Sequence, residues 1–107
     1  MNFDQYYSIA LQNETIDVNS NLRQWTYQYC NEFGFFQTPN PVYPLRSAEI
    51  DLAFWEPYCK RIFGADFADA HTDETNNYYH GLAITGKNIY FANSSEDPWQ
   101  TAGMAHF

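Results

Sequence analysis

The sequence predicts an α/β protein to which this chain supplies helices and a single strand. Two segments carry apolar residues at helical spacing, one from Leu22 and one after Ser47. A later segment, residues 89–92, is continuously apolar, as in a strand covered on both faces. No other segment predicts a strand, and a lone strand leaves its ladder hydrogen bonds unmet. We therefore expect the rest of the sheet to lie outside this chain.

The first half of the chain predicts two helices separated by a polar loop. Residues 3–12, FDQYYSIALQ, are typical of a short helix. The loop NETIDVNSN follows and offers several N-cap residues, Asn19 and Ser20 among them. The next helix has Gly34 as its C-terminal stop, and its apolar face is strongly aromatic. The residues of that face are Leu22, Trp25, Tyr29, Phe33 and Phe36.

The second half of the chain is predicted to hold one more helix and the strand. Residues 38–45, TPNPVYPL, contain three prolines and indicate an extended connection. Ser47 is the expected cap of the following helix, which Pro57 should kink or divide into two. Residues 64–81 are expected to form a polar loop. The turn at residues 85–87 then leads into the strand at 89–92.

Composition excludes several classes of partner. The chain has 107 residues, the size of one small domain, and a formal net charge of -8 without a cluster of Lys or Arg. Nucleic acid and anionic membrane surfaces are therefore not expected as partners. No apolar run is long enough to span a bilayer, and we expect no export signal in this chain. Aromatic residues make up 20%, so some rings should pack against something outside the chain.

Two cysteines and two glycosylation sequons bear on the compartment. Cys30 and Cys59 could be buried thiols in a reducing compartment or one bridge in an oxidising one. The triplet that begins at Asn13 is a sequon, and we predict glycosylation there. The triplet that begins at Asn93 is also a sequon, but it lies at the predicted strand end, where a glycan would clash. Asn93 is therefore not expected to be modified.

Four blocks resemble a known family. Residues 23–38, RQWTYQYCNEFGFFQT, resemble the RQWxYQxCTEFGxxQT signature of the S28 serine peptidases. The pairs YC and FG, then TNNYYHG at 75–81 and NIYFANSSEDPW at 88–99, follow in the family's order. The family includes lysosomal Pro-X carboxypeptidase, dipeptidyl peptidase II and thymus-specific serine protease. The resemblance covers about residues 22–103, and EFG and NNYY favour the thymus-specific branch.

The resemblance implies part of an α/β-hydrolase fold. Residues 1–81 would be the late part of its helical cap domain, and residues 82–107 would hold the returning sheet strand and the turn with the catalytic aspartate. Asp97 matches the aspartate of a Ser-Asp-His triad, and Trp99 matches a wall of the pocket for the residue before the cleaved bond, commonly proline. The cysteines match a cap disulfide. The family resemblance also implies a secreted or lysosomal location.

Some positions depart from the family. Asn31 stands where the family has Thr, and His80 and Ser94 stand where it has Gly, a residue that often marks a left-handed backbone angle. Dipeptide-removing members tend to carry an acid where Thr26 stands. The nucleophile block and the terminal histidine block are both absent from these residues.

Each candidate residue also has a structural interpretation. An aspartate before proline commonly forms a turn, and Trp99 and Trp25 could be core residues, which we prefer for Trp25. Glu32 could line the family's cleft, although a solvated helix face is preferred. We expect no cofactor and no metal, because one group of acids around a histidine lacks ligand spacing and is interpreted as a solvated loop. That group is Asp69, His71, Asp73 and Glu74.

A local triad of Ser94 or Ser95 with Asp97 and His106 is rejected, because a nucleophile needs an elbow and an oxyanion hole built from another part of the sheet. Two functional hypotheses remain. This chain is part of a proline-preferring serine exopeptidase that acts on peptides, inactive alone because the nucleophile and the histidine belong to the rest of the peptidase fold. Alternatively, it is a noncatalytic binding or structural subunit derived from such a peptidase.

Overall fold

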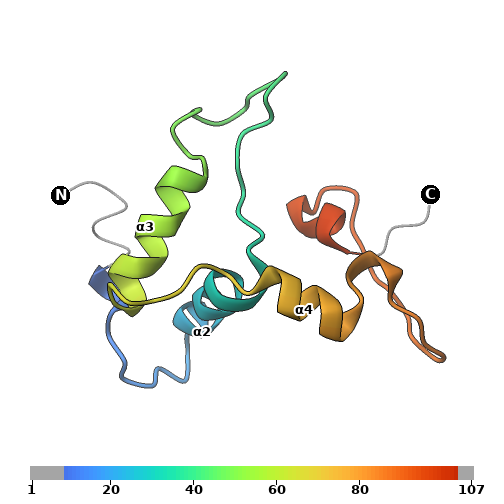
Figure 1. The fold of residues 1–107 in the computed structure, drawn as a ribbon, viewed down its shortest axis with the longest axis horizontal. Coiled ribbons are helices and arrows are strands. Elements are labelled where there is room, and N and C mark those ends of the chain that lie inside the picture. The colour runs from blue at the N-terminus through green and yellow to red at the C-terminus, as the bar shows by residue number, and fades with distance from the viewer. Residues whose placement is uncertain (1–8, 104–107) are drawn as a thin grey trace. The chain divides into compact units, whose positions relative to one another are not determined.

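The computed structural model describes residues 9–103, which are helical and irregular (Figure 1). The chain divides into two compact units, residues 1–72 and residues 73–107. Residues 9–11 are helical, in agreement with the predicted helix at 3–12, whose remaining residues up to 8 lie outside the described part. No helix within residues 9–103 has the length and apolar character needed to cross a bilayer.

Helix α2, in the first unit, confirms the aromatic helix. It spans Leu22–Gln28 and continues as a π-helical turn, Tyr29–Phe33. Gly34 ends it with φ +59°, and its N–H donates to the carbonyl of Tyr29 at 3.0 Å. A Cβ at this position would lie 2.5 Å from Cγ2 of Thr72. Glycine is therefore required here both for the backbone angle and for space.

Helix α3, Leu52–Phe63, starts later than predicted. Its N-cap is Asp51, whose side chain accepts the backbone N–H of Phe54 at 3.1 Å, so the prediction of Ser47 as the cap is wrong. The helix also continues through Pro57 as one element, so of the two expected outcomes, a kink or a division, the division into two helices is wrong. Proline removes only one backbone donor, and Pro57 is exposed, so water can satisfy the carbonyl one turn earlier.

The core of the first unit is small and lies on α3. Leu11, Tyr58 and Ile62 are buried together, and Trp55 and Phe63 pack against them half-buried. Aromatic contacts extend this core: Tyr27 meets Phe63 edge-on at a centroid distance of 5.4 Å. The spacing of Tyr58 and Ile62 by four residues places them on one helix face.

The second unit contains a helix that the sequence analysis interpreted as loop. Helix α4 spans Thr72–Tyr79, within the predicted polar loop at 64–81. Its first turn holds Asp73 and Glu74, whose charges favour a helix N-terminus, and this explains how a polar segment becomes helical. His80 follows with φ +68°, so the family's glycine position keeps the left-handed angle that glycine adopts freely.

The predicted strand at residues 89–92 is not found. The described residues, 9–103, form no strand, and Tyr90 in the middle of this segment is 91% exposed. No side chain from residue 73 to residue 97 is buried. A strand is defined by hydrogen bonds to a neighbour, and no segment of the described residues offers that neighbour. The returning strand is accordingly not a feature of this chain alone.

Candidate functional site

Asp97 lies at the start of a short 3₁₀-helix, Pro98–Ala102. It is the N-cap, and its Oδ1 accepts the backbone N–H of Trp99 at 2.9 Å. Pro98 follows at the first helical position, where its missing N–H costs nothing. The sequence DPW therefore folds locally into a cap that fixes the direction of the aspartate side chain.

The backbone around Asp97 closes the turn on both sides. The N–H of Asp97 donates to the carbonyl of Ser94 at 3.1 Å, and the N–H of Gln100 donates to the carbonyl of Asp97 at 3.0 Å. The side-chain amide of Gln100 also donates to the carbonyl of Ser94, at 2.9 Å. Ser94 has no positive φ, so serine replaces the family's glycine here without left-handed strain.

The carboxylate of Asp97 is held by one oxygen and exposed. Within the described residues, its Oδ2 has no hydrogen-bond partner. An aspartate in this state can accept a further N–H, such as that of an imidazole. The same cap is also what a turn-forming aspartate makes, so this geometry is compatible with both interpretations. Trp99, beside it, is half-buried.

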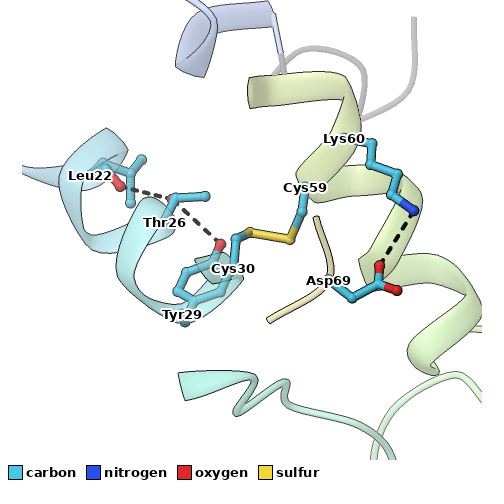
Figure 2. The surroundings of a disulfide bond; sticks show 7 residues. All are labelled: Leu22, Thr26, Tyr29, Cys30, Cys59, Lys60 and Asp69. Carbon is cyan, nitrogen blue, oxygen red and sulfur yellow. Dashed lines mark hydrogen bonds and ion pairs between the residues drawn. A yellow bond between two sulfur atoms is a disulfide. The ribbon is translucent and has the colours of Figure 1, made fainter. Parts of the chain in front are cut away.

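The two cysteines form the predicted disulfide (Figure 2). Cys30 lies in the π-helical turn and Cys59 in α3, with their Cα atoms 5.8 Å apart. Both are buried, at 1% and 4% exposure. The bridge thus joins the two aromatic helices inside the first unit and adds two apolar side chains to a small core.

Thr26 lies one helical turn before Cys30 and is completely buried. Its hydroxyl donates to the carbonyl of Leu22 at 2.8 Å and accepts the hydroxyl of Tyr29 at 3.4 Å, as Figure 2 shows. The position at which dipeptide-removing members tend to carry an acid is therefore occupied by a satisfied hydroxyl. Through these two hydrogen bonds Thr26 links the preceding turn of α2, at Leu22, to the π-helical turn that follows, at Tyr29.

Two members of the acidic group around His71 make contacts with other parts of the first unit. Asp69 pairs with Lys60 of α3 at 3.3 Å (Figure 2). The backbone N–H of His71 donates to the carbonyl of Asn31 at 2.7 Å. Across residues 9–103, no three side chains of His, Cys, Asp or Glu gather as metal ligands would. His106, the last member of the rejected local triad, lies outside the described residues.

A hollow of about 700 Å³, which was not predicted from the sequence, lies beside α2. It is lined by the loop at residues 13–17 and by polar residues of the helix, including Gln28 and the half-buried Glu32. Arg23 lies in its wall: its guanidinium donates to the carbonyl of Leu11 at 2.5 Å and stacks 4.8 Å from the ring centre of Phe63. Glu32 is therefore not on a fully solvated face. Arg23 opens the block at residues 23–38, and that position is the signal in the sequence that could have pointed to this hollow.

The comparison with known protein families decides the relationship. The profile of the peptidase family described as serine carboxypeptidase S28 matches residues 2–106. The chain belongs to the S28 family. The resemblance of the four sequence blocks is thereby confirmed, and the family's members are serine peptidases.

Several curated relatives agree with the S28 assignment. "Probable serine protease EDA2" of Arabidopsis thaliana is 38% identical over 92 residues, which are 86% of this chain and 19% of that protein. Thymus-specific serine protease of Mus musculus is 38% identical over 85 residues, 77% of this chain and 16% of that protein. The equal identities do not single out the thymus-specific branch.

The name of a further, fungal relative states a compartment for that protein. "Probable extracellular serine carboxypeptidase" of Arthroderma benhamiae is 33% identical over 92 residues, 82% of this chain and 13% of that protein. The chain thus spans about a fifth or less of the length of these S28 relatives. No solved structure matches the chain.

Proposed function

We propose that this chain supplies the triad aspartate and the disulfide-linked part of the cap to a proline-preferring serine exopeptidase. The nucleophilic serine and the catalytic histidine would lie in sequence outside residues 1–107. The observation that carries this proposal is the place of Asp97 in a chain that matches the S28 family over residues 2–106, in a turn that anchors one carboxylate oxygen on a backbone N–H and leaves the other without a partner among the described residues.

In this proposal Asp97 acts on the histidine and makes no bond to the substrate. Its Oδ2 accepts the N–H of the imidazole, which fixes the ring's tautomer and leaves the other nitrogen to take the serine proton. As the serine attacks the scissile carbonyl, the ionised carboxylate stabilises the imidazolium that forms. The bond from Trp99 N–H to Oδ1 keeps the carboxylate directed while this occurs.

Trp99 would form a wall of the pocket for the residue before the cleaved bond. An indole face is a broad apolar surface and a pyrrolidine ring is compact and apolar, so the ring can pack against that face. Trp99 lies two residues after Asp97, in the short helix that Asp97 caps. The specificity wall and the triad aspartate would therefore be positioned by one turn.

The exposure of the second unit supports its being part of a larger fold. Tyr90 is 91% exposed, Tyr78 is 77% exposed, and nothing from residue 73 to residue 97 is buried. Removing apolar side chains from water lowers the free energy, so such a segment is stabilised most when another surface covers it. The same exposure also favours the second candidate, a noncatalytic subunit that uses these rings as an interface.

A chimaera separates the two candidates. In mouse thymus-specific serine protease, the segment that is 38% identical to this chain is replaced by the corresponding residues of this chain. The chimaera is made both with Asp97 and with Asp97→Asn. We expect the chimaera to hydrolyse peptides, and Asp97→Asn to lower kcat about ten-thousandfold, as for other triad aspartates. Glu96→Gln, the neighbouring exposed acid, is the matched control and should change kcat less than about twofold.

The substrate panel pairs peptides that have proline before the cleaved bond with the same peptides carrying alanine there, cut from either end. Trp99→Ala should raise KM for the proline peptides more than for the alanine peptides. Loss of less than about tenfold in kcat with Asp97→Asn would contradict the triad role. The isolated 107-residue chain should show no turnover above that of its own Asp97→Asn variant. If the isolated chain did turn over substrate and the variant did not, the serine and the histidine could not both lie outside residues 1–107.

A further inference from the structure

The first sequon lies on an exposed loop of the first unit. Figure 1 shows this loop, in blue, as an arc from the helical turn at residues 9–11 to the start of α2. Asn13 and Thr15 are both exposed, and the loop begins from a fixed point because the side-chain amide of Gln12 donates to the carbonyl of Arg61 at 2.7 Å. The sequon is therefore presented to solvent on an anchored base.

The local geometry of the sequon leaves the amide nitrogen of Asn13 available. Its Oδ1 accepts the backbone N–H of Thr15 at 3.0 Å, so the side chain folds back over its own sequon. Within the described residues, its Nδ2 has no hydrogen-bond partner. Glu14, the middle residue, faces Arg23 at 3.5 Å. The nucleophilic atom and the hydroxyl residue that defines the sequon are thus accessible together.

The disulfide and the surface around Asn13 point to the same modification. A buried bridge between Cys30 and Cys59 forms in oxidising compartments, and one of these, the lumen of the endoplasmic reticulum, is also where N-glycosylation takes place. The loop after Asn13 leaves Ile16 82% and Val18 91% exposed. A glycan is bulky and solubilising, and at Asn13 it would shield these apolar side chains.

The second sequon is also exposed, but the side chain of its asparagine lies against the chain. The Oδ1 of Asn93 lies 2.9 Å from the position that a Cβ on Gly103 would take, so its amide is packed against that backbone. The carbonyl of Ser94 accepts two hydrogen bonds that close the Asp97 turn. A glycan at Asn93 would therefore stand against the turn that holds Asp97.

We propose that Asn13 carries an N-linked oligosaccharide and that Asn93 does not. In the transfer, Nδ2 of Asn13 bonds to the anomeric carbon of the first sugar of a lipid-linked oligosaccharide. The lipid pyrophosphate leaves with the electron pair of the broken bond, and the amide proton passes to a base of the transferase. The product is an amide-linked glycan on the loop before α2.

The test uses the 107-residue chain behind a cleavable secretory leader in a eukaryotic host. The secreted chain should carry one glycan by intact mass, removable by peptide N-glycosidase, with labelled aspartate at position 13 after release in heavy-oxygen water. Thr15→Ala should abolish the glycan, Thr15→Ser should retain it, and Ser95→Ala should change nothing. Mass is read on the denatured chain from medium and cells together, so that a variant that folds poorly and is retained is read as well.

Thiols are blocked before lysis, so that an oxidised Cys30–Cys59 bridge reports passage through the oxidising compartment. An oxidised wild-type chain without glycan would overturn the proposal. A glycan that persists in Thr15→Ala, or that is lost in Ser95→Ala, would overturn it as well, because each places the modification on Asn93.

Discussion

Removing the Cys30–Cys59 bridge should cost the first unit much of its stability. The cysteines are 29 residues apart. In the chain-entropy model, opening a disulfide-closed loop of about 30 residues lowers the unfolding free energy of the unit by about 3.6 kcal/mol. A unit of 72 residues typically has about 4–11 kcal/mol in total. Its buried apolar side chains are few, so the low end of that range applies. The opened unit should therefore be marginally folded or unfolded at 25 °C.

The assay is guanidinium unfolding of the oxidised chain, the reduced chain and the Cys30→Ala/Cys59→Ala variant. Tryptophan fluorescence, to which the core-packed Trp55 contributes, and far-UV circular dichroism report the transition. Reductant should lower the unfolding free energy of the wild type and leave that of the variant unchanged. If reduced and oxidised wild type differ by less than about 0.5 kcal/mol, loop closure does not stabilise this unit and the reasoning is refuted.

Two further predictions concern the ends of the helices. Gly34→Ala should lower the unfolding free energy by at least about 1 kcal/mol from its left-handed angle alone. Adding Thr72→Ser removes the Cγ2 that lies 2.5 Å from the new Cβ and should recover only the part of the unfolding free energy that the clash costs. Recovery of the whole loss in denaturant unfolding would show that the backbone angle is not strained. Asp51→Ala should cost about 1 kcal/mol and lower the helicity, because it removes the cap of α3. Ser47→Ala should cost less than about 0.5 kcal/mol, and the reverse order of these two effects would contradict the assigned cap.

The features that the sequence predicted correctly depend on local chemistry. The spacing of aromatic residues from Leu22 and the glycine at position 34 were sufficient for α2 and its end, because helical hydrogen bonds join residues four apart. The family and the pairing of Cys30 with Cys59 followed from ordered sequence blocks. The sequence also placed Asp97 in a turn, since aspartate before proline caps its own following backbone.

The tertiary structure decided what several local patterns left open. Ser47 and Asp51 are both acceptable caps, and the helix begins at the second, from which Tyr58 and Ile62 reach the core. Pro57 is tolerated because its side of α3 is exposed. The segment at 89–92 has the composition of a buried strand, yet Tyr90 is exposed and no ladder forms in residues 9–103. A helix satisfies its hydrogen bonds within its own segment, whereas a strand needs a neighbour, and composition alone does not provide one.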